Sequence, residues 1–84
     1  MSKVLLTLKI MPEDVNIDIQ NLKNEILSKI KANIKEVPIA FGLVALHVSL
    51  FVEDKEGEIE KVERTLKRIK GIGEIEVIEM TRTL

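Results

Sequence analysis

The stretch from Leu43 to Val52 constrains the fold most strongly, because apolar side chains recur at every second position along it. A period of two is that of a β-strand, in which successive side chains point to opposite faces. The more apolar face holds Val44, Leu46, Val48, Leu50 and Val52. The other face is more mixed and holds Leu43, Ala45, His47, Ser49 and Phe51. The segment therefore predicts a strand in a sheet that is covered on one face and more open on the other.

Three further strands are predicted, over residues 3–11, 33–40 and 74–80. The first also alternates, with one apolar face formed by Val4, Leu6, Leu8 and Ile10 and a more mixed second face. The second contains Pro38, which has no backbone N–H to give to a ladder, so this strand is expected at an edge. In the last strand, the Val77-Ile78 pair breaks the alternation and predicts a β-bulge or a shift of face.

Two amphipathic helices are predicted between these strands. The first is expected to have Asp18 as its N-cap and to run to about Ala32. The second is expected over Glu58–Lys70, with Gly71 as its C′ residue. Their apolar stripes are Ile19, Leu22, Ile26 and Ile30 in the first, and Ile59, Val62, Leu66 and Ile69 in the second.

The resulting order is βαββαβ, and each helix has only one apolar stripe to bury, so both should lie on the same face of the sheet. This predicts an α+β, ferredoxin-like sandwich: a four-stranded antiparallel sheet with two helices on one face. Right-handed crossovers place the first and third strands in the centre. The length of 84 residues indicates a single domain over residues 1–84.

Composition excludes several classes of function. The net charge of −1 argues against direct binding of nucleic acid, which needs a basic excess. The absence of cysteine excludes disulfides, zinc–thiolate sites and thiol catalysis. The apolar stretch after Lys3 is too short to span a membrane and lacks a signal-peptide cleavage site. These features fit a cytoplasmic protein without membrane association.

Residues that could support catalysis or metal binding are few. The single histidine, His47, has no nucleophile or carboxylate motif beside it. The acidic residues from Glu53 to Glu60 lack the ligand register of a calcium loop. The Gly71-Ile72-Gly73 segment follows a helix and precedes a strand, which is the reverse of a phosphate-binding loop. We therefore expect no enzymatic chemistry, no cofactor and no metal.

The segment "PIAFGLV", residues 38–44, leaves two interpretations of Phe41 open. A phenylalanine is usually buried, so Phe41 could pack in the core or under the turn. Alternatively, Pro38 and Gly42 could fix a rigid turn that presents the ring as an anchor for a partner. Arg82, by its position near the C-terminus, reads on general grounds as a frayed cation without a role.

Three segments carry a resemblance to a known family. They are "KVLLTLKIMPED" near the start, "VPIAFGLVALHVSLFVED" in the centre and "IKGIGEIEVIEMTRTL" at the end. Together they resemble the archaeal elongation factor 1-beta family, the guanine-nucleotide exchange factors for elongation factor 1-alpha. The "PIAFGL" portion is the most specific, and eukaryotic members share its Pro-Ile-x-Phe/Tyr-Gly core and a "VED" after the third strand.

The resemblance implies a function by binding, without covalent chemistry. The partner would be the GTPase elongation factor 1-alpha, and the partner-binding residues would be Phe41, Gly42 and Arg82. Phe41 matches an aromatic residue that wedges into the GTPase, and Arg82 matches a basic residue that reaches toward the magnesium site. Arg82 stands where eukaryotic members have lysine, and two residues follow it instead of one.

Two other classes of function were weighed against exchange. A ferredoxin-like domain can also sense a small ligand or a metal, usually at a dimer interface along an edge strand. It can also serve as an assembly module. No convergent polar groups mark such a ligand site in the sequence, and a monomer is favoured, although the oligomeric state is not determined by the sequence.

Overall fold

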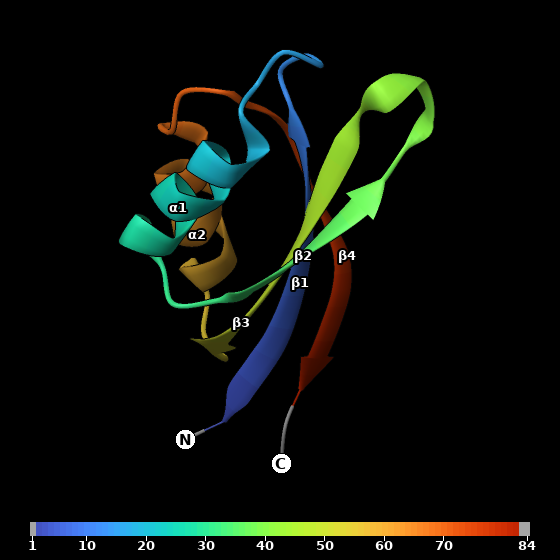
Figure 1. Cartoon of the computed structure of the whole chain (residues 1–84). Coiled ribbons are helices and arrows are strands. Elements are labelled where there is room, and N and C mark those ends of the chain that lie inside the picture. The colour runs from blue at the N-terminus through green and yellow to red at the C-terminus, as the bar shows by residue number, and fades with distance from the viewer. Residues whose placement is uncertain (1, 83–84) are drawn as a thin grey trace.

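The computed structural model describes residues 2–82 and has the predicted order of elements (Figure 1). The strands are β1 (Lys3–Pro12), β2 (Asn33–Pro38), β3 (Val44–Glu53) and β4 (Ile72–Arg82). The helices are α1 (Ile19–Lys29) and α2 (Glu58–Lys67), and a short turn of 3-10 type covers Ala40–Gly42.

The strands form one antiparallel sheet in the order β2-β3-β1-β4, so β1 and β3 are central, as predicted. Both helices lie on one face of this sheet, and the hairpin between β2 and β3 extends beyond them (Figure 1). The start of β1 and the end of β4 lie side by side at the opposite end of the sheet. The predicted ferredoxin-like sandwich is therefore confirmed.

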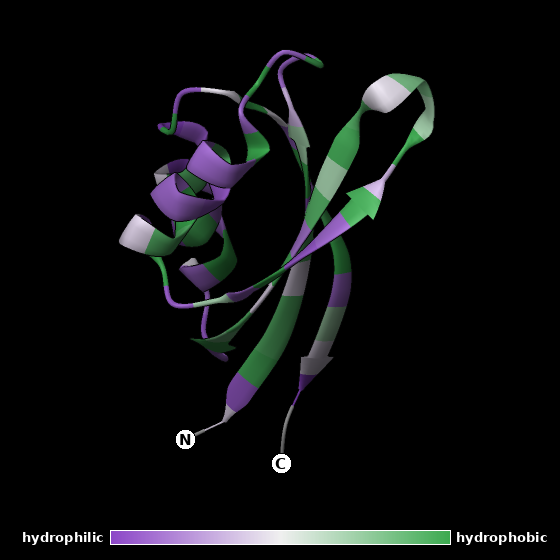
Figure 2. Ribbon diagram, in the orientation of Figure 1, coloured by the Kyte–Doolittle hydropathy of each residue, from purple (hydrophilic) through white to green (hydrophobic). Residues whose placement is uncertain are grey.

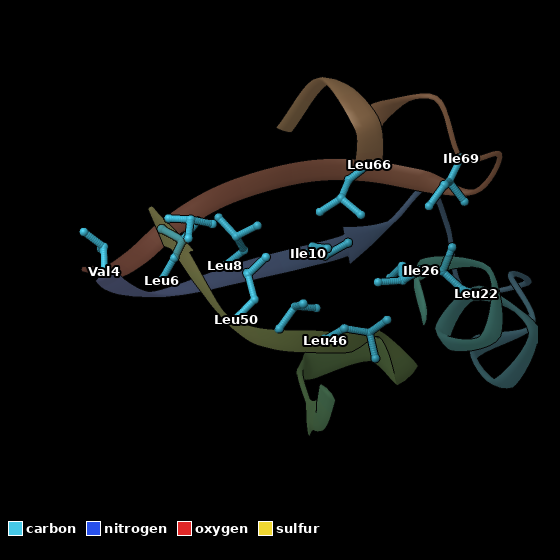
Figure 3. Close-up of a cluster of buried hydrophobic side chains, with 12 residues drawn as sticks. Val4, Leu6, Leu8, Ile10, Leu22, Ile26, Leu46, Leu50, Leu66 and Ile69 are labelled. Atoms are coloured by element: carbon cyan, nitrogen blue, oxygen red, sulfur yellow. The ribbon is translucent and has the colours of Figure 1, made fainter. Parts of the chain in front are cut away.

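The core lies between the sheet and the helices (Figure 3). The alternating residues of β1 and β3 face one another across the ladder, with Leu6 opposite Leu50 and Leu8 opposite Val48. The helices contribute Leu22, Ile26, Leu66 and Ile69, all buried. Period-two and period-3.6 patterns thus meet at one apolar layer, and burial of such side chains is the main force that stabilises the domain.

The predicted irregularity at Val77-Ile78 is a β-bulge. Thr7 pairs with Glu79 and Leu8 pairs with Val77, so Ile78 has no partner on β1. Because of this extra residue, Val77 and Met80 both lie on the face of the sheet that holds Leu6 and Leu8. The bulge explains why the apolar alternation of β4 breaks without the strand leaving the sheet.

Several predicted boundaries were wrong by a few residues. The helix α1 ends at Lys29 rather than near Ala32, because Ile30 takes an extended backbone (φ −137°, ψ 156°) and starts the connection to β2. The helix α2 ends at Lys67 rather than at Lys70. The strand β2 ends at Pro38 instead of Ala40, whereas β4 extends from Ile72 to Arg82 and is longer than predicted.

Candidate functional site

The turn between β2 and β3 has an unusual backbone. Phe41 has φ 63° and ψ 31°, and Gly42 has φ 78°, so two consecutive residues occupy the left-handed region. The amide of Leu43 donates to the carbonyl of Ala40 at 3.4 Å, and the amide of Ile39 donates to the carbonyl of Leu43 at 2.7 Å. Positive φ at both central residues and the bond from Leu43 to Ala40 are features of a type I′ turn, and the bond from Ile39 to Leu43 flanks it.

The Phe41 side chain is 94 % exposed, which excludes the interpretation of Phe41 as a core residue. The left-handed region costs a residue with a side chain roughly 1–2 kcal/mol, and asparagine or glycine would be the usual choice at this position. Backbone strain of this kind concentrates at functional sites. An exposed aromatic ring on a strained backbone gives the isolated domain little packing benefit and is available for contact with another molecule.

The surroundings of Phe41 are apolar as well. From Val37 to Leu46 the chain has no charged residue, and Ile39 is 37 % exposed beside the turn. Figure 2 shows the end of this hairpin in green and white, the colours of apolar and intermediate residues. We name residues 38–43 the hairpin tip. Its composition fits insertion into an apolar pocket of another protein.

Arg82 is the last residue of β4 and is held by an ion pair. Its Nε donates to Oδ2 of Asp54 at 2.8 Å. In the sheet Arg82 pairs with Val4, so its side chain lies on the face that the helices cover. Arg82 is therefore ordered at the end of β4 rather than frayed, and its role in binding stays a prediction. The residues that follow it, 83 and 84, lie outside the described part of the chain.

The structure does not bring Arg82 together with the hairpin tip. Phe41 lies just before Val44, the first residue of β3. Arg82 lies at the level of Val52, near the other end of β3, because both residues pair with Val4 on the strand β1 between them. At about 3.3 Å per residue, the β3 strand separates the two levels by about 26 Å. Phe41 and Gly42 thus lie at one end of the sheet, and Arg82 lies at the other end.

A groove of about 590 Å³ surrounds the Arg82 end. Its apolar floor is formed by Val4, Val52, Ile59 and Met80. The rim is charged and consists of Glu53, Asp54, Lys55, Glu56, Glu60 and Arg82. Sequence reasoning assigned no role to Asp54 or Met80. The signal that could have found Asp54 was the "VED" that ends the β3 strand and is shared with the resembled family.

The open face of the sheet offers little chemistry. His47 is half-buried there, between Lys9 on β1 and Lys35 on β2. Thr7 and Ser49 share a hydrogen bond of 3.1 Å between their hydroxyl oxygens. Among residues 2–82, no group of three histidine or carboxylate side chains is placed to hold a metal ion. No helix in this described range is long and apolar enough to cross a membrane.

Comparison with known families defines the class of protein. Residues 5–83 match the model of the EF-1 guanine nucleotide exchange domain, and the chain belongs to this family. The resemblance seen in the sequence is therefore confirmed, and the alternative of a ligand-sensing domain is not favoured.

Individual relatives carry the name elongation factor 1-beta. The protein of that name from Methanothermobacter thermautotrophicus is 43 % identical over 89 aligned positions, which cover 100 % of both chains. The one from Staphylothermus marinus is 43 % identical and covers 92 % of both chains. The one from Thermoplasma volcanium is 39 % identical over 89 % of this chain and 91 % of its own.

Among solved structures, the ACT domain of a GTP pyrophosphokinase from Chlorobium tepidum superimposes with a TM-score of 0.66. The superposition covers 92 % of this chain and 88 % of the ACT domain at 20 % identity. At that identity the likeness supports the ferredoxin-like fold and says nothing of activity.

Proposed function

We propose that the chain promotes release of GDP from elongation factor 1-alpha by binding to it, without covalent chemistry. Membership of the exchange-domain family supports this proposal. The observation that carries the site assignment is the Phe41 ring, exposed to 94 % on a strained turn in a domain whose other large apolar residues mostly face the core.

In the proposed complex, the hairpin tip is the anchor. Phe41 would fill an apolar pocket on the GTPase, and Gly42 would hold the turn that aims the ring. Aromatic anchors of this kind supply a large share of the binding energy of an interface. Because the type I′ turn fixes the backbone before binding, little entropy is lost there when the complex forms.

We propose that the end of the sheet that holds Arg82 acts on the nucleotide site of the GTPase. A cation near the phosphate end of the nucleotide site competes with Mg²⁺ for the same oxygens, and loss of Mg²⁺ weakens the hold on GDP. A guanidinium is planar and suits bidentate contact with phosphate or carboxylate oxygens, rather than the compact position of a metal ion. We therefore propose that Arg82 contacts the oxygen atoms that bind Mg²⁺ and does not occupy the position of the ion itself.

The separation of the two sites suits this division of labour. The central strand β3 connects the hairpin tip to the groove at Arg82 over about 26 Å. A rigid sheet would transmit the position of the anchor to the end that holds Arg82. We also propose that the domain acts as a monomer in the cytoplasm, without direct contact to nucleic acid. Pro38 in β2 and the glutamates 74, 76 and 79 in β4 discourage pairing at the sheet edges.

Release of a fluorescent GDP analogue from an archaeal elongation factor 1-alpha tests the proposal. The chain at micromolar concentration should accelerate release at substoichiometric ratios, because an exchange factor turns over. Arg82→Ala should lower the maximal rate more than the apparent affinity, and Phe41→Ala should do the reverse. No acceleration at micromolar protein would contradict the exchange function, and equal effects on both parameters would contradict the division between the two ends.

A further inference from the structure

The ion pair of Arg82 reaches across the end of the sheet. Arg82 on β4 pairs with Val4 on β1, and Val4 pairs with Val52 on β3. Asp54 follows β3, yet its carboxylate accepts the Nε hydrogen of Arg82 at 2.8 Å. The Arg82 side chain therefore extends past β1, on the helix-covered face, toward the loop that leads into α2.

Asp54 is a well-held acceptor. Its backbone amide donates to the carbonyl of Ser2 at 3.1 Å, which ties the loop to the chain just before β1. Its side chain is 28 % exposed, compared with 73 % for the side chain of Arg82. The neighbouring Lys55 lies 3.6 Å from Glu53 and 3.7 Å from Glu58, so it connects the end of β3 to the first turn of α2. The backbone of Asp54 is thus anchored, and the guanidinium is the more exposed partner of the pair.

The atom that Asp54 binds is informative. The 2.8 Å contact is made by Nε, the inner nitrogen of the guanidinium. A bond at Nε fixes the plane of the group, and the outer edge, which consists of one N–H from each terminal amino group, then points away from the acceptor. This outer edge can form bidentate bonds with phosphate or carboxylate oxygens. The contact orders the arginine and keeps its outer edge available in an exposed side chain.

We propose that Asp54 is a positioning residue for exchange, which orients the Arg82 guanidinium toward the nucleotide site of the GTPase. This inference rests on the proposed function. A long side chain samples many rotamers in water, and an arginine that is already oriented loses less freedom when it meets its target. Because the Arg82 side chain is 73 % exposed, the bond is weak enough to guide Arg82 without trapping it.

The test is a double-mutant cycle in the GDP-release assay. Asp54→Ala removes the acceptor, Asp54→Asn keeps a side-chain oxygen in place, and Glu56→Ala is the control because it removes the same charge from the same groove. Each is measured with Arg82 and with Arg82→Met, at saturating and at limiting concentrations of the exchange domain. Thermal unfolding identifies any variant that fails to fold.

Asp54→Ala should lower the maximal rate about three- to five-fold, the upper part of the range expected for an exposed ion pair, with little change in half-saturation. Asp54→Asn should recover part of the loss, and Glu56→Ala should behave as the unsubstituted chain does. With Arg82→Met, Asp54→Ala should have no further effect. An equal loss in both backgrounds would assign Asp54 a structural role only, and a faster rate would show that Asp54 restrains Arg82; either result overturns the proposal.

A measurement on the free domain separates this inference from the proposed function. In ¹⁵N spectra, the Nε–H group of Arg82 should show restricted motion and slow exchange with water. Asp54→Ala should make this group mobile, whereas Glu56→Ala should not. A mobile Nε–H in the unsubstituted chain would overturn the positioning role even if exchange is fast. An ordered Nε–H with no effect of the chain on GDP release would instead count against the exchange function itself.

Discussion

Replacement of Phe41 by asparagine should make the free domain more stable and should weaken its binding to elongation factor 1-alpha. Asparagine followed by glycine is the preferred pair for a type I′ turn, because both residues tolerate positive φ. Phe41 has φ 63° and a side chain 94 % exposed, so the substitution relieves strain and removes almost no buried area. We expect a gain of about 1 kcal/mol in the free energy of unfolding, or about 4–8 °C in Tm for a domain of this size.

The effect on binding should have the opposite sign. A phenylalanine that passes from nearly full exposure into a pocket buries about 150 Å², which corresponds to roughly 4 kcal/mol. Interface anchors cost about 2–4 kcal/mol when truncated, so the affinity for elongation factor 1-alpha should fall roughly 30- to 1,000-fold. Thermal unfolding followed by circular dichroism gives the first effect, and titration calorimetry gives the second.

Phe51 provides the matched control. It is the other phenylalanine of the chain, 61 % exposed, and lies in the regular strand β3 opposite Leu5. Phe51→Asn should lower stability slightly, since the extended backbone there favours an aromatic residue, and should leave affinity within about two-fold. A loss of stability in Phe41→Asn would show that the ring packs in the free domain. Unchanged affinity would remove Phe41 from the interface.

Three further substitutions test the backbone that supports these sites. Gly42→Ala should lower the free energy of unfolding by about 1 kcal/mol because φ is 78°, although no atom lies within 4 Å of the added Cβ. Gly42→Asn should restore most of this free energy, and equal losses in the two variants would mean that φ is not the cause. Gly73→Ala would place its Cβ 2.9 Å from the carbonyl oxygen of Pro12, so denaturant unfolding should show a loss of 1–3 kcal/mol, about the range for overpacking; a neutral result would contradict the close approach. Asp18→Ala removes the cap that accepts from the amide of Asn21 at 3.1 Å and should cost about 1 kcal/mol, whereas Asp18→Ser should retain most of it.

Much of the fold could be predicted because its signals are local. The alternation in β1 and β3 and the stripes of α1 and α2 are read within a few residues, and their single apolar faces leave one layered arrangement. Even the bulge at Ile78 was predicted, from a break in the alternation. The ends of the elements were less accurate, since whether Ile30 continues α1 or turns toward β2 depends on contacts with the rest of the domain.

The candidate site was predictable in part. Resemblance selected Phe41, Gly42 and Arg82, and their role in binding stays a prediction. The residue pattern alone did not decide whether Phe41 is buried or exposed, because phenylalanine occurs both in packed turns and as an interface anchor. No pattern connects Asp54 with Arg82, which lie 28 positions apart in the chain.

The sequence by itself determined the order of the elements, the faces that they bury and the family to which the chain belongs. These properties follow from short-range periodicity and from motifs that keep their spacing. Only the tertiary structure decided that Phe41 is exposed, because the β2–β3 hairpin extends past both helices and leaves nothing to cover the ring. Only the register of β4 on β1, with its bulge, brings Arg82 to the end of the sheet where Asp54 can hold it.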